Sequence, residues 1–200
     1  SARRAPLDGA TLAVNNSLQV FTDKGQSPAY WAGCDPQAHL ADFLKTPPSQ
    51  TTYLVASKAD PSVFEALKHC KVIVWHIDDP CVWDLIEHRN PVATSVSITL
   101  TSFALMEMLG YRTFETWGWD GCYIDGLDHA SPQVHGGSDI RVGIPDAREP
   151  DGYRYFETTN SWALEAQDAL NKLPAHTVSI MGDGFIAARA AYHFRERAAA

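Results

Sequence analysis

The chain has 200 residues, of which 45% are hydrophobic and 20% are charged, an ordinary balance for a globular protein. Its 24 acidic and 16 basic residues give a net charge of −8, which argues against binding to nucleic acid or an anionic membrane through a basic surface. No apolar segment reaches the roughly 20 residues of a membrane-spanning helix. We therefore expect one domain that covers residues 1–200.

The N-terminal half alternates short apolar segments with segments of helical spacing. We expect strands over residues 10–15, 29–34, 51–56 and 71–77, the last of them continuous and rich in β-branched residues. Helices are expected over residues 17–24, 37–45, 62–69 and 81–87. The pairs Asp35-Pro36 and Asp60-Pro61 each fit a helix start, with Asp as N-cap and Pro in the first turn.

The second half continues this alternation. The longest helix is expected over residues 95–109, ended by Gly110, and a strand over 112–117 follows it. After an extended segment over 153–158, we expect a helix over 160–173 with Asn160 or Ser161 as its cap, a strand over 176–181 and a helix over 185–197. Strands separated by helices form βαβ units. The sequence therefore predicts an α/β fold, with a Rossmann-like, mostly parallel sheet and helices on both faces.

The segment from Gly121 to Pro150 is rich in Gly, Asp, His and Pro and lacks helical or strand spacing. A loop of this length inside a domain is usually functional, and we expect it to close over the site as a lid. His129 and His135 in this loop are the best candidates for an acid or base, because histidine titrates near neutral pH.

The four cysteines favour a reducing compartment. They form no C-x-x-C pair, and their spacing matches no zinc-binding pattern. We expect buried free thiols, and hence a cytoplasmic location, for Cys34, Cys70, Cys81 and Cys122.

Polar residues follow several of the expected strands. Open α/β sheets bind their ligands outside the carboxyl ends of the strands, so these positions are candidates for a site. They are Asn15-Asn16, Asp35, Ser57-Lys58, His76 to Asp79, and Asp120. The sequence has no Walker phosphate-binding loop and no G-x-S-x-G nucleophile motif.

Two blocks of the chain carry a resemblance to a known family. The first is Leu12-Ala13-Val14-Asn15-Asn16 followed by Trp31-Ala32-Gly33-Cys34-Asp35-Pro36, and the second runs from Thr94-Ser95 through the long helix to Leu109-Gly110-Tyr111 and Trp117-Gly118-Trp119-Asp120. In order and spacing they resemble the 6-hydroxymethylpterin diphosphokinase MptE-like family, over roughly residues 10–125. The second block is also similar to one in a bacterial sialyltransferase family and in flagellin-modifying glycosyltransferase-like proteins.

The resemblance implies a nucleotide-dependent transferase. The reaction would be pyrophosphoryl transfer from ATP to a pterin-like alcohol, or sugar transfer from a nucleotide-sugar to a small-molecule acceptor. A third alternative is a non-catalytic binding or assembly module of the same fold. The family's Gly-Pro-Ser-Leu turn has no counterpart in this chain, and Pro91-Val92-Ala93-Thr94 stands where the family has a glycine-containing loop.

The resemblance also implies roles for particular side chains. Asn15 or Asn16 would bond the nucleotide, and Thr94 and Ser95 would receive a phosphate at the start of the long helix. Asp35 and Asp120 would hold Mg²⁺, and Asp120 could also serve as a general base.

Each of these residues also has a plainer structural interpretation. The asparagines, Asp35, Thr94 and Ser95 are all good helix caps, and an aspartate beside a glycine, such as Asp120, commonly forms a turn. We expect these residues, from four separate strand ends, to line one cleft.

Overall fold

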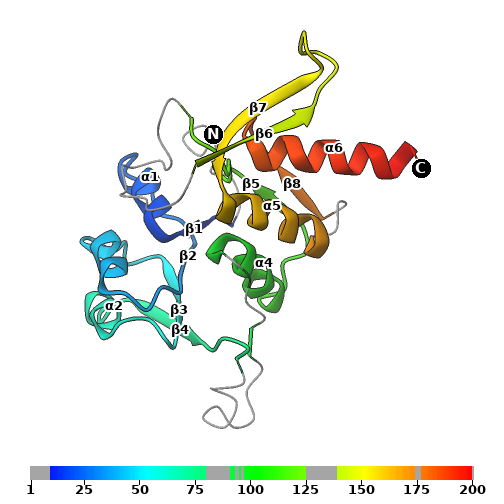
Figure 1. Ribbon diagram of the computed structural model, residues 1–200. Helices are drawn as coiled ribbons and strands as arrows, with labels where there is room; N and C mark the ends of the chain where they lie inside the picture. The colour runs from blue at the N-terminus through cyan, green and yellow to red at the C-terminus, as the bar shows by residue number, and fades with distance from the viewer. Residues whose placement is uncertain are drawn as a thin grey trace. The chain divides into compact units, whose positions relative to one another are not determined.

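The computed structural model describes residues 10–79, 91–92, 95, 97–124, 139–173 and 177–199 (Figure 1). The chain divides into two compact units, Pro6–Leu109 and the C-terminal part from Gly110. We call these the N-terminal unit and the C-terminal unit and describe each by itself. The single domain expected over residues 1–200 stays a prediction.

The N-terminal unit is built on a four-stranded parallel sheet. Its strands are β1 (Leu12–Val14), β2 (Tyr30–Gly33), β3 (Thr52–Ala56) and β4 (Lys71–Trp75), in that order across the sheet. Because the order in the sheet is also the order in the chain, right-handed crossovers place all connecting helices on the same face. These helices are η2 (Asn15–Ser17), α1 (Leu18–Thr22), η3 (Ala38–Leu44) and α2 (Pro61–Ala66).

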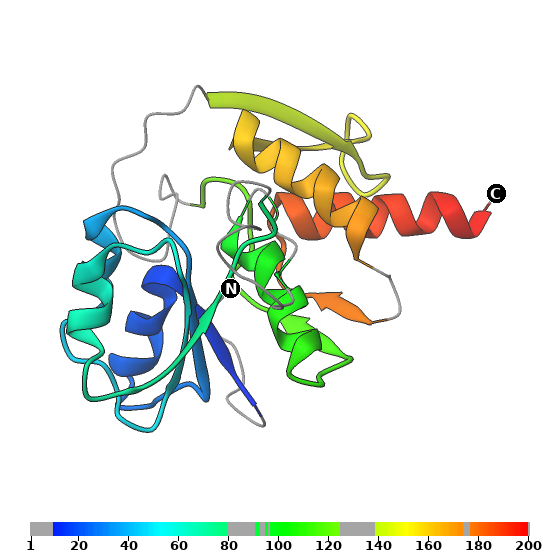
Figure 2. The ribbon, with the colours of Figure 1, turned by 90° about the horizontal axis from the view of Figure 1, so that it is seen from below.

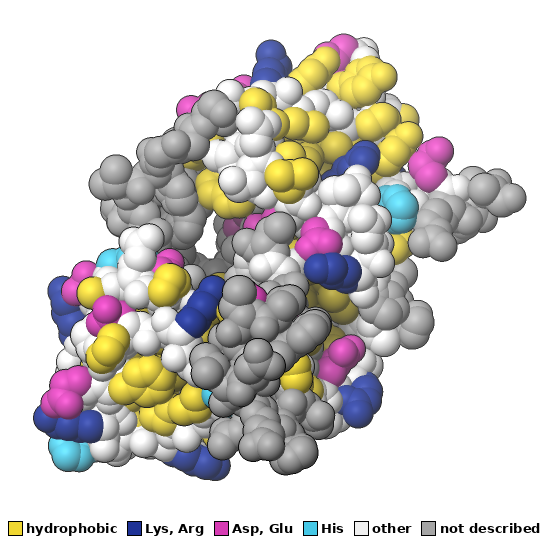
Figure 3. Space-filling model, turned by 60° about the horizontal axis from the view of Figure 1, so that its bottom comes forward, with side chains coloured by type: hydrophobic (Ala, Val, Ile, Leu, Met, Phe, Trp, Pro, Cys, Tyr) yellow, Lys and Arg dark blue, Asp and Glu magenta, His cyan; other side chains and the backbone are white. Residues whose placement is uncertain are grey.

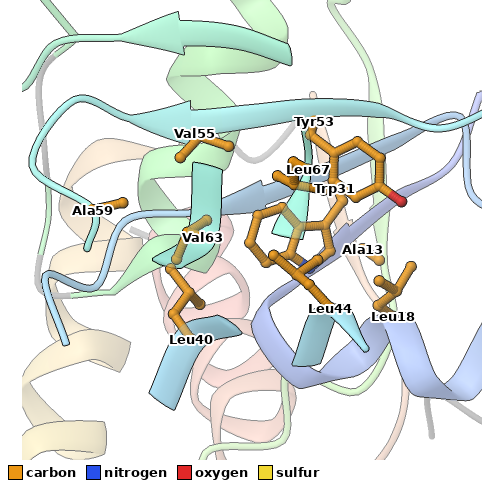
Figure 4. Packing of buried hydrophobic residues seen from close by; sticks show 10 residues of the cluster. All are labelled: Ala13, Leu18, Trp31, Leu40, Leu44, Tyr53, Val55, Ala59, Val63 and Leu67. Atoms are coloured by element: carbon orange, nitrogen blue, oxygen red, sulfur yellow. The ribbon is translucent and has the colours of Figure 1, made fainter. Parts of the chain in front are cut away.

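The core of this unit lies between that face and the connecting helices. Trp31 and Tyr53 are fully buried at its centre, with ring centroids 5.8 Å apart. Figure 4 shows their rings among aliphatic side chains from the strands and helices. The cluster comprises Ala13, Leu18, Trp31, Leu40, Leu44, Tyr53, Val55, Ala59, Val63 and Leu67.

The opposite face of the sheet packs against α4 (Ile98–Met108), which contacts β1 and β2. Side chains alternate between the faces of a strand, so Ala32, Leu54 and Ala56 point away from the Trp31 cluster, and all three are buried. Helices therefore cover both faces of a parallel sheet, which confirms the predicted α/β class.

The C-terminal unit contains two smaller sheets. In one, β5 (Phe114–Thr116) pairs in parallel with β8 (Val178–Ile180); in the other, β6 (Asp139–Pro145) and β7 (Tyr153–Thr159) form an antiparallel hairpin. The helices α5 (Asn160–Lys172) and α6 (Phe185–Ala199) lie side by side in Figures 1 and 2, and α6 also contacts β6 and β8.

Strand β6 corrects the expectation of an irregular loop from Gly121 to Pro150. Residues 139–145 read Asp-Ile-Arg-Val-Gly-Ile-Pro, which alternates polar or small residues with apolar ones. Ile144 and Phe156 turn inward and are buried, whereas Tyr153 and Tyr155 are nearly half exposed on the other face. A two-residue period was therefore present in the sequence. Residues 125–138, the rest of the expected lid, lie outside the described residues.

The N-caps of three helices are not the residues that the sequence predicted. Helix α4 begins at Ile98 with Ser97 as its N-cap, whose side chain accepts a hydrogen bond from the Leu100 N–H, so Ser95 does not cap it. Helix α5 is capped by Thr159 and not by Asn160 or Ser161. The N-cap of η3 is Gln37 and not Asp35.

The other Asp-Pro pair forms the expected cap. Asp60 is the N-cap of α2, its carboxylate accepts hydrogen bonds from the Ser62 N–H at 2.9 Å and the Ser62 hydroxyl at 2.6 Å, and Pro61 is the first helical residue. These hydrogen bonds lower the pKa of Asp60 below its ordinary value. The cap thus depends on an ionised carboxylate.

The described cysteines, Cys34, Cys70 and Cys122, are free thiols. Cys122 is buried, whereas Cys34 and Cys70 are partly exposed, and Cys81 lies outside the described residues. No helix in the described ranges has the length and apolar character to cross a bilayer.

Candidate functional site

The four parallel strands of the N-terminal unit end at one edge of their sheet. We call this the carboxyl edge and define it by the residues that directly follow the strands. They are Asn15 and Asn16 after β1, Cys34 and Asp35 after β2, Ser57 and Lys58 after β3, and His76 after β4. The edge therefore gathers amide, carboxylate, hydroxyl, ammonium and imidazole groups on four neighbouring strands.

Asn15 is held in a strained conformation. Its φ of 45° makes it the one non-glycine residue with positive φ in the described part of the chain. The Trp31 indole Nε1 donates a hydrogen bond of 2.8 Å to the Asn15 carbonyl oxygen, which fixes this backbone from the core. The side-chain Oδ1 is buried and has no hydrogen-bond partner among the described residues. Strain and an unpaired buried acceptor at one residue are typical of a ligand site.

Asp35 forms a local turn after β2. Its Oδ1 accepts a hydrogen bond of 2.8 Å from the Gln37 N–H, and its Oδ2 lies 3.6 Å from His39 Nε2. The side chain of Asp35 is one-third exposed, so its carboxylate still reaches solvent. Asp35 is therefore a turn former and not the helix cap that its structural interpretation expected. Its ligand role stays a prediction.

Cys34 and Lys58 bring a thiol and a cation to the same edge. Burial raises the pKa of the Cys34 thiol, while the Lys58 ammonium lowers it and the Asp35 carboxylate raises it. Both charges therefore lie close enough to act on the thiol. Cys34 stays protonated at neutral pH, and Lys58 supplies the edge with a positive charge.

Ser57 and His76, which the sequence names only as separate strand-end candidates, form a hydrogen-bonded pair. The Ser57 Oγ lies 3.0 Å from His76 Nδ1, across the ends of β3 and β4. The parallel ladder continues here, because the Ser57 N–H donates to the Trp75 carbonyl at 2.8 Å. Their positions after two predicted strands were a signal for this pair, but strand register is needed to bring them together.

Ser95 does not lie at the start of α4, where the sequence placed it. Ser95 lies three residues before the helix, and its N–H donates to the Thr101 hydroxyl at 3.2 Å. Thr94 lies outside the described residues, as do His129 and His135. Their proposed roles stay predictions.

Asp120 lies in the C-terminal unit, in the turn that follows β5. Its carbonyl oxygen accepts a hydrogen bond from the Ile186 N–H at 3.1 Å, in the first turn of α6. A Cβ on Gly184 would lie 2.6 Å from both the Cα and the carbonyl oxygen of Asp120, so this close approach requires glycine. The neighbouring Trp119 donates from Nε1 to Glu165 Oε1 at 2.7 Å, and both side chains are buried.

This turn has a structural role that accounts for its two glycines. Gly118 and Gly121 have φ of 75° and 62°, a region that residues with a Cβ avoid. The Phe185 N–H at the start of α6 faces Cys122 Sγ at 3.4 Å, so protein groups engage the first amides of that helix. Asp120 and the carboxyl edge belong to separate units, and the expected common cleft stays a prediction.

The described residues do not form a metal centre of their own. Within the described ranges no group of three or more His, Cys, Asp and Glu side chains is arranged to hold a metal ion. The Mg²⁺ expected at Asp35 and Asp120 would have one carboxylate ligand from each unit. The Asp35 carboxylate already accepts a hydrogen bond from the Gln37 N–H.

The distribution of charged side chains on the surface is in keeping with the net charge of −8. On the face drawn in Figure 3, Lys and Arg side chains are scattered among Asp and Glu and form no continuous basic area. On this face, an anionic ligand would therefore be held by a few local groups and not by a broad positive surface.

The parallel sheet, the helices on both of its faces and the polar carboxyl edge define a Rossmann-like α/β fold. The whole chain is similar to a solved structure, the MAf glycosyltransferase from Magnetospirillum magneticum AMB-1. The TM-score is 0.61 and the sequence identity 13%, over 98% of this chain and 33% of that chain. No family model matches the chain, and no curated protein matches it.

The likeness shows a fold shared with a glycosyltransferase. The chain spans about a third of that protein's length. Membership of the MptE-like family stays a prediction.

Proposed function

We propose that the chain is a glycosyltransferase domain. It binds a nucleotide-sugar at the carboxyl edge of β1–β4 and transfers the sugar to a hydroxyl group of a small-molecule acceptor. Two facts support this proposal: the fold shared with the MAf glycosyltransferase, and the polar side chains at the edge where such sheets bind ligands.

Asn15 is the observation that carries the proposal. A buried amide oxygen without a partner costs about 1–3 kcal/mol, and a left-handed conformation adds to this cost. A nucleotide base or ribose offers N–H and O–H donors that would satisfy Asn15 Oδ1. The fixed backbone of Asn15, held by Trp31, would present this oxygen in one orientation. A binding role explains why the chain keeps a costly residue at this position.

Lys58 completes the donor site. Its ammonium group, at the end of β3, would neutralise the phosphates of a nucleotide-sugar bound along the edge. β1 and β4 are three strand spacings apart, about 14 Å at roughly 4.8 Å each. This length suits an extended ligand with its base at β1, its phosphates near β3 and its sugar at β4.

The test is equilibrium binding by calorimetry. The probes are UDP-glucose, UDP-N-acetylglucosamine, GDP-mannose, CMP-N-acetylneuraminic acid and ATP, each with and without Mg²⁺. We expect one of the sugar donors to bind, and Asn15→Gly to weaken that binding while the protein stays folded. Asn171→Ala, on an exposed face of α5, is the matched control and should bind as the unchanged protein does.

The rival functions give different results in the same titrations. Binding of ATP with Mg²⁺ and of no sugar nucleotide would favour the pyrophosphoryl transferase that the MptE-like resemblance implies. No binding of any nucleotide would favour the non-catalytic module. Equal affinity of the Asn15→Gly variant and the unchanged protein would remove Asn15 from the site.

A further inference from the structure

We infer that His76 is the general base of the carboxyl-edge site, with Ser57 as the residue that positions its imidazole ring. The inference rests on the proposed glycosyltransferase function and assigns the residue that handles the proton. It starts from the contact of 3.0 Å between Ser57 Oγ and His76 Nδ1.

The sheet places this pair where a reacting group can reach it. Ser57 and His76 are the first residues after β3 and β4, and the register pairs Ala56 with Trp75 immediately before them. Ser57 is exposed and His76 is half-buried. The backbone at His76 is fixed on its other side, because the Val92 N–H donates to the His76 carbonyl at 2.8 Å. The ring therefore stands at the rim of the sheet on a rigid backbone.

The roles of the two ring nitrogens depend on the tautomer, and the general base uses the tautomer in which Nδ1–H donates to Ser57 Oγ. When Nδ1–H donates to Ser57 Oγ, the lone pair of the neutral imidazole is on Nε2. Nε2 is then the basic atom, and Ser57 holds the ring in one orientation. The same arrangement, a base oriented by a second side chain, recurs in sites that activate hydroxyl groups.

Glycosyl transfer needs a base of this kind. The acceptor O–H bond breaks and its proton passes to His76 Nε2, while the acceptor oxygen forms a bond to the anomeric carbon of the donor sugar. The bond from the anomeric carbon to the phosphate oxygen breaks, and its electron pair leaves with the nucleotide. Lys58, the residue next to Ser57, supplies a positive charge near the departing phosphate.

The experiment separates this role from a structural one. Slow hydrolysis of the bound donor, with water as the acceptor, needs the same proton removal and no knowledge of the natural acceptor. His76→Asn keeps an amide near the Nδ1 position, where it can still bond Ser57, but it cannot take up a proton. We expect it to lower kcat for donor hydrolysis by about 10²- to 10⁴-fold, with little change in donor affinity.

Two further variants sharpen the result. Added imidazole should restore part of the activity of His76→Gly, because free imidazole can take the place of the missing ring as the base. If His76 had only a structural role, added imidazole would not restore activity. Ser57→Ala should lower kcat less than His76→Asn does. His69→Asn is the matched control. His69 is exposed and lies two residues before β4 begins at Lys71, so it is at the opposite edge of the sheet.

Several outcomes overturn the inference. One is an unchanged kcat in His76→Asn together with intact donor binding, which leaves the proposed function standing. Another is complete loss of activity in Ser57→Ala together with a covalent sugar on Ser57 of the unchanged protein, detected by mass spectrometry, which makes Ser57 the nucleophile. Binding without turnover by the unchanged protein would show a non-catalytic module. Failure of every sugar donor to bind removes the proposed function itself, and this inference with it.

Discussion

The indole Nε1 of Trp31 donates a hydrogen bond of 2.8 Å to the carbonyl oxygen of Asn15. Trp31 is the fully buried centre of the core, and Asn15 is the strained residue at the carboxyl edge. The core and the candidate site thus share one contact, and the conformation of Asn15 is set by the packing of the ring. A change in either residue should be visible in both stability and binding.

The strain at Asn15 predicts different stabilities for two small substitutions. Asn15→Gly removes the unpaired Oδ1 and accepts the φ of 45° without cost, so its free energy of unfolding should equal or exceed that of the unchanged protein. Asn15→Ala keeps a Cβ in the left-handed region and should be about 1 kcal/mol less stable than Asn15→Gly. Urea unfolding measures both, and equal stabilities of the two variants would contradict a strained backbone.

Gly33 should tolerate no side chain. A Cβ at this position would lie 2.4 Å from Cη2 of the Trp31 indole, and the buried ring has no space to retreat. Gly33→Ala should therefore lower the free energy of unfolding by about 1–3 kcal/mol, the usual cost of overpacking a core. Gly143→Ala is the control, because its Cβ would meet the exposed ring of Tyr155 at 3.0 Å, and that ring can move. Similar losses in the two variants would contradict this account.

The buried pair of Trp119 and Glu165 should stabilise the C-terminal unit. Trp119→Phe removes the Nε1 donor of a buried 2.7 Å hydrogen bond and leaves the Glu165 carboxyl short of a partner, which should cost about 2–3 kcal/mol. Trp117→Phe removes the same kind of bond from the exposed Glu115 and should cost less than about 0.5 kcal/mol. Thermal unfolding followed by circular dichroism compares the two variants. An equal fall in the melting temperature of both would show that burial does not strengthen the Trp119–Glu165 hydrogen bond.

The Asp60 cap predicts a dependence of stability on acid pH. Hydrogen bonds from Ser62 lower the pKa of Asp60 in the folded protein below its ordinary value of 3.8. Its contribution is therefore complete above that value and is lost as the pH falls through the lower, folded-state pKa. Asp60→Ala should be less stable than the unchanged protein at pH 7, and this difference should shrink towards pH 3. A difference that stays constant over this range in urea unfolding would exclude the ionised cap.

The sequence predicted the class of fold because parallel strands leave a strong local signal. The segments of β3 and β4 are continuous apolar runs between helices, and their α/β arrangement follows from general rules of chain connection. Strand β6 was missed because Gly, Pro and His residues around it dominated the composition of its segment. The N-caps of three helices were missed by one to three residues because several residues that can cap a helix, such as Thr94, Ser95 and Ser97, stand close together in the sequence.

The site was less accessible to prediction than the fold. Asn15 was singled out as the end of a strand, but its positive φ and unpaired oxygen depend on contacts with a residue in the next strand. Ser57 and His76 are nineteen positions apart, and only the register of β3 against β4 brings their side chains together. Such pairs are set by tertiary structure, and no local pattern in the sequence encodes them.

The order of the strands has a consequence for how the chain folds. In the N-terminal unit each strand pairs with the next one along the chain, so every pairing closes a short loop. In the C-terminal unit β5 pairs with β8, and the hairpin and α5 lie between them in the chain. Since loop closure slows folding, we expect the β1–β4 sheet to form early, while β5 waits for β8, which is synthesised only after the hairpin and α5.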